Sequence, residues 1–149
     1  MKQMIKNISD FVDEEITLKG WLYNKRSSGG IVFLEIRDGS GFVQAVVRKD
    51  DVDEETWEAA EDLTQESSLE ISGEVSQHPK KEDVYELQVS NIDIIQLVEE
   101  EYPISLKEHG PDFLLQNRHL WLRDPKQWAA LKIRDTIVRG IREYLDQND

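Results

Sequence analysis

One predicted strand carries an aromatic ring and two charged groups on the same face, within the stretch GGIVFLEIRDGSGFVQAVV that runs from Gly29 to Val47. Successive side chains of a strand point to opposite faces. The alternate apolar residues then form a core face: Val32, Leu34 and Ile36. Phe33, Glu35 and Arg37 point the other way. An exposed ring among polar groups suits an unpaired nucleobase, because each stacked base contributes about 1–3 kcal/mol and polar neighbours contact its edges.

Each of these residues also has a purely structural interpretation. Phe33 could cap one end of a barrel or be covered by the N-terminal segment. Arg37 could form an ion pair with Asp38 that holds a hairpin together, and Gln44 could be an ordinary solvated strand residue. From the residues alone, the binding and structural interpretations of Phe33 have about equal weight.

The elements that would position this face are five strands and one helix. Alternating apolar residues predict the first strand, the loop KRSSGG follows it, and Asp38 to Gly41 has the composition of a hairpin turn. A run of acidic residues with apolar spacing predicts a helix with a solvated outer face. The predicted strands are 15–24, 31–37, 42–47, 67–77 and 85–98, and the predicted helix covers roughly 51–65.

Five antiparallel strands with one helix between the third and fourth are the element order of an OB-fold, a small Greek-key barrel. We therefore expect a mainly β fold whose barrel covers residues 1–98. An extended linker, 99–126, should have little regular structure, since it contains prolines. A long C-terminal helix, 127–149, follows with an unpartnered apolar stripe: Leu131, Ile137, Val138, Ile141 and Leu145.

Net charge and composition limit the kind of protein. The net charge of −13 argues against a polyanionic partner, but it is concentrated in residues 48–101, with eighteen acids and four bases. Residues 1–47 carry six acids and six bases, so a neutral or locally basic surface remains available there. Cysteine is absent, which excludes disulfides and thiolate chemistry. With no signal-peptide core and no long apolar run, we expect a soluble cytoplasmic protein.

In OB-folds, the outer face of strands two and three and the two loops beside it bind oligonucleotides or oligosaccharides. Gln44 would share that face with Phe33, while Lys25 and Arg26 would lie in the first flanking loop. Lys80 and Lys81 would lie in the second loop. The chain's three histidines have no ligand-like spacing, so we expect no metal site: they are His78, His109 and His119.

Over nearly its whole length the chain resembles the N-terminal part of class IIb aminoacyl-tRNA synthetases, most closely the asparaginyl branch. Shorter matching motifs are GWLYNKR (20–26), SSLEISGEV (67–75) and YELQVSNIDII (85–95), together with the stretch from Gly29 to Val47. The most specific motif is YPISLKEHGPDFLLQNRHLWLRDP (102–125). The final helix resembles class II motif 1, through which two catalytic domains associate.

The resemblance implies a role in tRNA anticodon recognition. It implies that Phe33 stacks on an anticodon base, that Gln44 reads the central uridine and that Arg26 contacts the anticodon loop. Aspartyl relatives use a glutamate on strand five for the third anticodon base, and the matching position here is Gln88. A carboxylate only accepts hydrogen bonds whereas an amide also donates, so Gln88 could favour uridine over cytidine. We expect Lys25, Arg37 and Lys80 to complete the contact surface.

Class II motifs 2 and 3 do not occur in these 149 residues, so we expect this segment not to be catalytic. The resemblance implies a full-length homodimeric enzyme that joins asparagine to its tRNA with ATP and magnesium, while this segment binds no cofactor. Three alternatives remain: an aspartyl enzyme that charges both tRNAs, a free-standing single-strand binder, and a protein-interaction module that uses the acidic helix.

Overall fold

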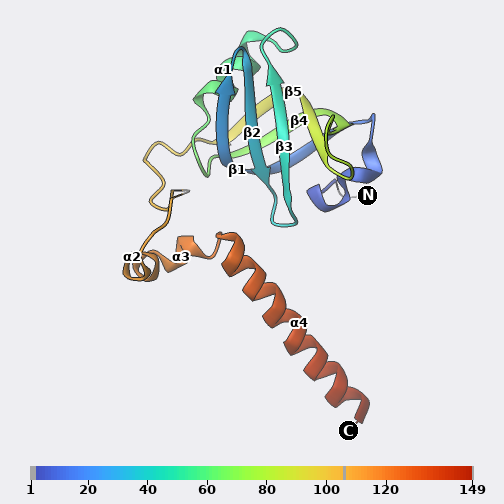
Figure 1. Cartoon of the computed structure of the whole chain (residues 1–149), viewed down its shortest axis with the longest axis vertical. Coiled ribbons are helices and arrows are strands. Elements are labelled where there is room, and N and C mark those ends of the chain that lie inside the picture. The colour runs from blue at the N-terminus through green and yellow to red at the C-terminus, as the bar shows by residue number, and fades with distance from the viewer. Residues whose placement is uncertain (1–2, 106, 149) are drawn as a thin grey trace. The chain divides into compact units, whose positions relative to one another are not determined.

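The N-terminal part of the chain is a closed five-stranded barrel (Figure 1). The structure is a computed structural model that describes residues 3–105 and 107–148. Around the barrel the strands follow the order β1-β2-β3-β5-β4, and the helix α1 lies between β3 and β4 in the chain. The barrel elements are η1 (Ile5–Phe11), β1 (Glu15–Ser28), β2 (Ile31–Arg37), β3 (Phe42–Arg48), α1 (Glu54–Asp62), β4 (Ser68–Gln77) and β5 (Tyr85–Gln96). The predicted OB-fold is confirmed.

One strand pair departs from the antiparallel arrangement. The strands β3 and β5 run parallel and pair over three positions. At the two outer positions, Gln44 lies opposite Glu86 and Val46 lies opposite Gln88. All other neighbouring strands are antiparallel. Strand directions cannot alternate all the way around a ring with an odd number of strands. The expectation of a wholly antiparallel barrel was therefore wrong at this seam.

The turn between β1 and β2 is shorter than predicted. Gly29 and Gly30 have φ values of 57° and 83°. Both values lie in the left-handed region that a two-residue hairpin turn requires. Ser28 already pairs with Ile31, so β1 continues to the turn. The predicted loop 25–30 is wrong for its first four residues, and Lys25 and Arg26 are strand residues.

The core consists of the inward side chains of all five strands, sealed by two helices. The helix α1 contributes Trp57 and Ala60, and Leu63 follows it. The Asp53 side chain caps the helix by accepting a hydrogen bond from the backbone N–H of Thr56 at 2.8 Å. A bond of this kind favours the ionised carboxylate, and it lowers the pKa of Asp53. The short helix η1 contributes Ile5 and Ile8 to the same core.

A second compact unit begins at Pro103, close to the predicted end of the barrel domain. Its helices are α2 (Pro111–Gln116), α3 (Arg118–Trp121) and α4 (Pro125–Asn148). The expectation of a linker with little regular structure was wrong from residue 111 onward, because Pro111 occupies the start of α2. Proline favours a helix at that position. In the described part of the chain, no helix has the length and apolar composition needed to cross a bilayer.

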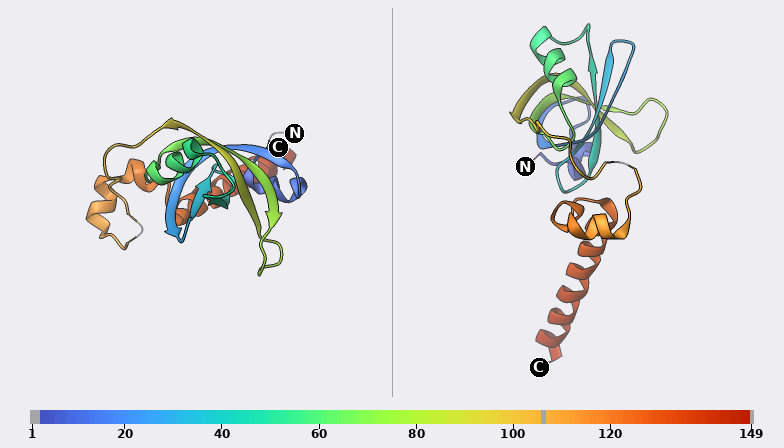
Figure 2. Two further views of the ribbon diagram at one scale, coloured as in Figure 1. Left: turned by 90° about the horizontal axis from the view of Figure 1, so that it is seen from above. Right: turned by 90° about the vertical axis from the view of Figure 1, so that its left-hand side faces the viewer.

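Figure 2 shows the loop between β4 and β5 projecting from the barrel, whereas β1, β2 and β3 lie side by side in Figure 1. The outer face of these three strands is where the sequence places its binding residues.

Candidate nucleic-acid interface

The strand β2 presents its aromatic residue on the outside of the barrel. Along the strand, buried and partly exposed residues alternate, with Val32, Leu34 and Ile36 fully buried. Phe33 is partly exposed and lines an open pocket of about 350 Å³ on the outer face. The predicted outward orientation of Phe33 is confirmed, and the ring is not part of the hydrophobic core.

Arg26 lies directly beside this ring. Because β1 continues through the predicted loop, Arg26 pairs with Phe33 across the two strands. Its guanidinium carbon lies 4.6 Å from the centroid of the Phe33 ring. This is a cation–π distance. The same guanidinium donates a hydrogen bond from Nη2 to Gln44 Oε1 at 2.8 Å. Three predicted site residues, from three adjacent strands, are therefore in contact.

The amide of Gln44 is held in one orientation. Gln44 Nε2 donates to Glu86 Oε1 at 2.6 Å, while Gln44 Oε1 accepts from Arg26. An arginine side chain has only donors and an ionised carboxylate has only acceptors. Only one orientation of the amide satisfies both neighbours, and it leaves one N–H and one oxygen lone pair of Gln44 for a ligand.

Gln88 lies next to this group on β5. The register places Phe33 opposite Val46, and Val46 opposite Gln88. The Gln88 amide accepts a hydrogen bond from Arg48 Nη1 and donates one to Ser76 Oγ at 2.9 Å. Its side chain is only partly buried, so the amide borders the same outer face.

Lys25 is not part of this group. It pairs with Leu34, whose side chain points into the core, and its ammonium donates a hydrogen bond to the carbonyl oxygen of Glu61 at the end of α1. Burial lowers the pKa of Lys25, while the carboxylates of Asp62 and Glu61 act in the opposite direction. The structure therefore directs Lys25 away from the Phe33 face and toward the helix.

Arg37 occupies the end of β2 and has a strong internal partner. Its guanidinium forms an ion pair with Glu66, and their side chains are only 12% and 4% exposed. The guanidinium carbon also lies 5.3 Å from the centroid of Trp21. The alternative pairing with Asp38 is wrong, because Asp38 instead accepts hydrogen bonds from the backbone N–H groups of Ile5 and Ser40, both at 2.8 Å.

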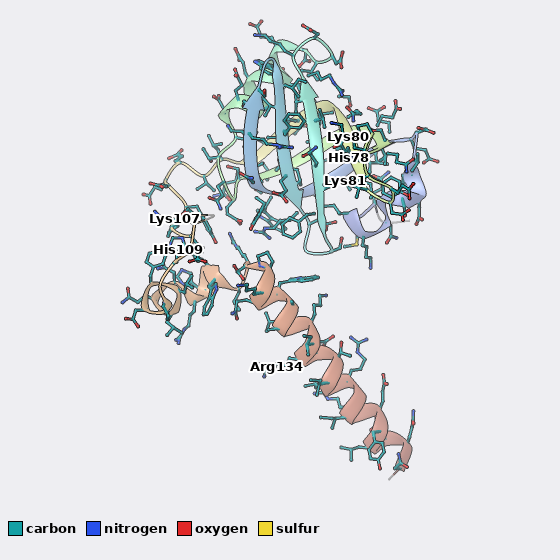
Figure 3. All side chains as sticks on the ribbon, in the orientation of Figure 1. His78, Lys80, Lys81, Lys107, His109 and Arg134 are labelled. Atoms are coloured by element: carbon teal, nitrogen blue, oxygen red, sulfur yellow. The ribbon has the colours of Figure 1, made fainter. Side chains whose placement is uncertain are left out.

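Lys80 and Lys81 are exposed on the projecting loop between β4 and β5 (Figure 3). His78, at the base of this loop, accepts a hydrogen bond at Nδ1 from the backbone N–H of Lys80 at 3.0 Å. Its Nε2 lies 3.6 Å from Glu86 Oε1. Through Glu86, the base of the loop is connected to Gln44.

Sequence reasoning missed Glu86 and Arg48 as members of the outer face. The alternation in YELQV does place Glu86 and Gln88 on one side of β5, and this signal was available. The sequence did not show that this side of β5 lies next to β3, because the parallel pairing of β3 with β5 joins residues about forty positions apart.

A closed five-stranded barrel with a ring, a guanidinium and amides on its oligonucleotide face defines a nucleic-acid-binding module. Comparison with known proteins agrees: residues 16–95 match the family described as OB-fold nucleic acid binding domain, and the chain belongs to this family.

The chain is also similar to particular tRNA ligases. It is 50% identical to the asparagine-tRNA ligase of Sorangium cellulosum over 94% of this chain and 31% of that protein. It is 47% identical to the enzyme of the same name from Pelotomaculum thermopropionicum over 99% of this chain and 34% of that protein. Among solved structures, asparaginyl-tRNA synthetase from Pyrococcus horikoshii matches with a TM-score of 0.89 and 35% identity, over 99% of this chain and 36% of that one. The chain thus spans about a third of the length of these relatives.

Proposed function

We propose that the outer face of β1, β2 and β3 binds the anticodon loop of the asparagine tRNA. The observation that carries this proposal is the contact group Arg26, Phe33 and Gln44, in which a partly exposed ring lies beside an amide of fixed orientation. The names of the relatives, which are asparagine-tRNA ligases, support the choice of tRNA. Unpaired bases bind such surfaces by stacking and by hydrogen bonds to their edges.

The free groups of Gln44 match a uracil. Uracil presents an N3–H donor beside a carbonyl acceptor, and Gln44 keeps one lone pair and one N–H for them. The base stacks on the Phe33 ring or on the guanidinium plane of Arg26, both of which are stacking surfaces for nucleobases. Glu86 acts as a positioning residue in this scheme, because it holds the Gln44 amide in the uracil-reading orientation.

Gln88 reads the third anticodon base. Its oxygen accepts from Arg48, so the amide orientation is set in the same manner as that of Gln44. Its remaining N–H donates to the carbonyl O4 of uridine, whereas cytidine has an amino group at that position and cannot accept.

Stem-loops that differ only in the third anticodon base test this function. The chain should bind the stem-loop ending in uridine more tightly than the one ending in cytidine by about 0.5–1.5 kcal/mol, the usual net contribution of one hydrogen bond. Isothermal titration of both stem-loops gives the difference. Equal affinities favour an aspartyl enzyme that charges both tRNAs, and length-dependent binding that ignores sequence favours a free-standing single-strand binder.

Arg26→Ala should weaken stem-loop binding and flatten its salt dependence. Removal of one phosphate contact reduces the slope of log K against log salt by about 0.7 for single-stranded RNA. Lys25→Ala is the matched control, since it removes a neighbouring charge that the structure directs toward α1. If both variants change the slope equally, Arg26 has no special role at the RNA backbone.

Two further residues have roles in this scheme. Lys80, which is exposed on its loop, supplies a second phosphate contact. Arg37 stabilises the end of β2 at the edge of the binding face through its ion pair with Glu66.

To the full-length protein we assign the attachment of asparagine to its tRNA in the cytoplasm, with ATP and magnesium bound outside this segment. The apolar stripe of α4 is largely exposed in this chain, with Ile137 at 55% and Leu145 at 61%. We assign this stripe to the dimer interface of the full-length homodimer. Sedimentation of the full-length protein with and without Ile137→Asp tests that assignment.

A further inference from the structure

The pocket beside Phe33 extends to a second aromatic ring. Its lining includes Phe42, the first residue of β3, which is 43% exposed. Tyr23 contacts this ring with 5.0 Å between centroids and an interplanar angle of 74°. Such an edge-to-face contact is a favourable arrangement for two rings. The pocket thus has two aromatic side chains in its lining, and only Phe33 is used by the proposed function.

Between the two rings, one row of polar side chains crosses the strands. Asn24 pairs with Glu35, Glu35 with Gln44, and Gln44 with Glu86. Gln44 and Glu86 are bonded to each other. Within the part of the chain that the structure describes, the Asn24 amide and the Glu35 carboxylate have no hydrogen bond or ion pair. Both line the pocket.

We infer that this half of the pocket binds a second unpaired base, and that the base is a guanine. The inference rests on the proposed function, because it takes the face to be an RNA-binding surface. The guanine stacks on Phe42, its N1–H and N2–H groups donate to the two oxygens of Glu35, and its O6 accepts from the Asn24 amide.

The chemistry of Glu35 selects this base over the others. A carboxylate only accepts hydrogen bonds, and guanine is the base with two adjacent donors on its Watson–Crick edge. Adenine and cytosine each offer one amino group, next to a ring nitrogen acceptor that faces the carboxylate unfavourably. In uracil, carbonyl oxygens flank the single N–H on both sides. A phosphate group is repelled by Glu35, so the pocket takes a base edge and not the backbone.

A cycle of one protein change and one RNA change tests the inference. The probes are two stem-loops with the asparagine anticodon GUU, one of which carries inosine in place of the guanosine. Inosine lacks the N2 amino group and is otherwise the same base. The wild-type chain should bind the inosine probe roughly tenfold more weakly, because one of the two hydrogen bonds to the Glu35 carboxylate is lost. In Glu35→Gln, the two probes should bind with nearly equal affinity.

Equal losses on inosine substitution in the wild type and in Glu35→Gln would overturn the inference, as would no loss in either. If Phe33→Ala still weakens binding in that case, the anticodon-binding function stands and only the guanine pocket falls. If no GUU stem-loop binds better than an unrelated hairpin, both proposals fall together.

Phe42→Ala is the second variant. It should weaken binding of the guanosine probe by roughly tenfold while keeping the preference for the central uridine.

Discussion

Phe33→Ala should weaken binding of the asparagine anticodon stem-loop by about 1–3 kcal/mol, which is the usual contribution of a base stacked on an aromatic side chain. The ring lies on the outer face and is absent from the hydrophobic core of the barrel, so its removal leaves no core cavity. The variant should therefore keep its thermal unfolding temperature while its affinity, measured by fluorescence anisotropy, falls. Loss of the partner ring also frees Arg26, which adds to the effect.

A matched control is Ile95→Ala, which removes an exposed apolar side chain near the C-terminal end of β5, whereas Gln88 lies toward the other end. Its affinity for the stem-loop should equal that of the wild type. Unchanged affinity in Phe33→Ala would mean that the ring is a structural residue. A fall in affinity in both variants would point to a general effect of surface hydrophobicity.

Glu66→Ala should destabilise the barrel by about 3–5 kcal/mol, because it leaves the guanidinium of Arg37 buried without its counter-ion. The two side chains are only 12% and 4% exposed, so the pair is largely shielded from solvent. Chemical denaturation with urea, followed by circular dichroism, measures the free energy of unfolding. The double variant R37M/E66A should recover most of the loss, since it removes both charges and fills the space with an apolar side chain.

The control for this prediction is an exposed ion pair between the neighbouring strands β1 and β4. Lys19 and Glu70 are bonded at 2.6 Å, but the lysine side chain is 72% exposed. Glu70→Ala should therefore cost only about 0–1 kcal/mol. If Glu66→Ala costs no more than Glu70→Ala, the burial of the Arg37 pair has no energetic consequence and the assignment of Arg37 to the scaffold is wrong.

Features that depend only on residues close together in the sequence could be predicted. The position of Phe33 follows from alternation within one strand, and the helix near residue 57 follows from its apolar spacing. The loop prediction before β2 is wrong because the polar composition of Lys25 to Ser28 resembles a loop, although two glycines suffice for the turn. The linker prediction is wrong over residues 111–121, because a proline can start a helix as well as prevent one.

Features that depend on distant residues could not be predicted. The partner of Arg37 is Glu66, on the segment between α1 and β4, and nothing in the local pattern indicates it. The partner of Gln44 is Glu86, which becomes its neighbour only when the barrel closes through the parallel pair β3 and β5. The residues of the proposed binding face were therefore partly predictable, but the hydrogen bonds that orient them were not.

A nuclear magnetic resonance titration of the chain with the GUU stem-loop tests whether the anticodon loop binds at Phe33 and Gln44. The ring signals of Phe33 and the side-chain amide signals of Gln44 are followed. Saturable shifts at both residues, with Ile95 and Lys19 unchanged, are the predicted result. Saturable shifts confined to α1 or to the outer face of β4, with Phe33 and Gln44 unmoved, would contradict the account.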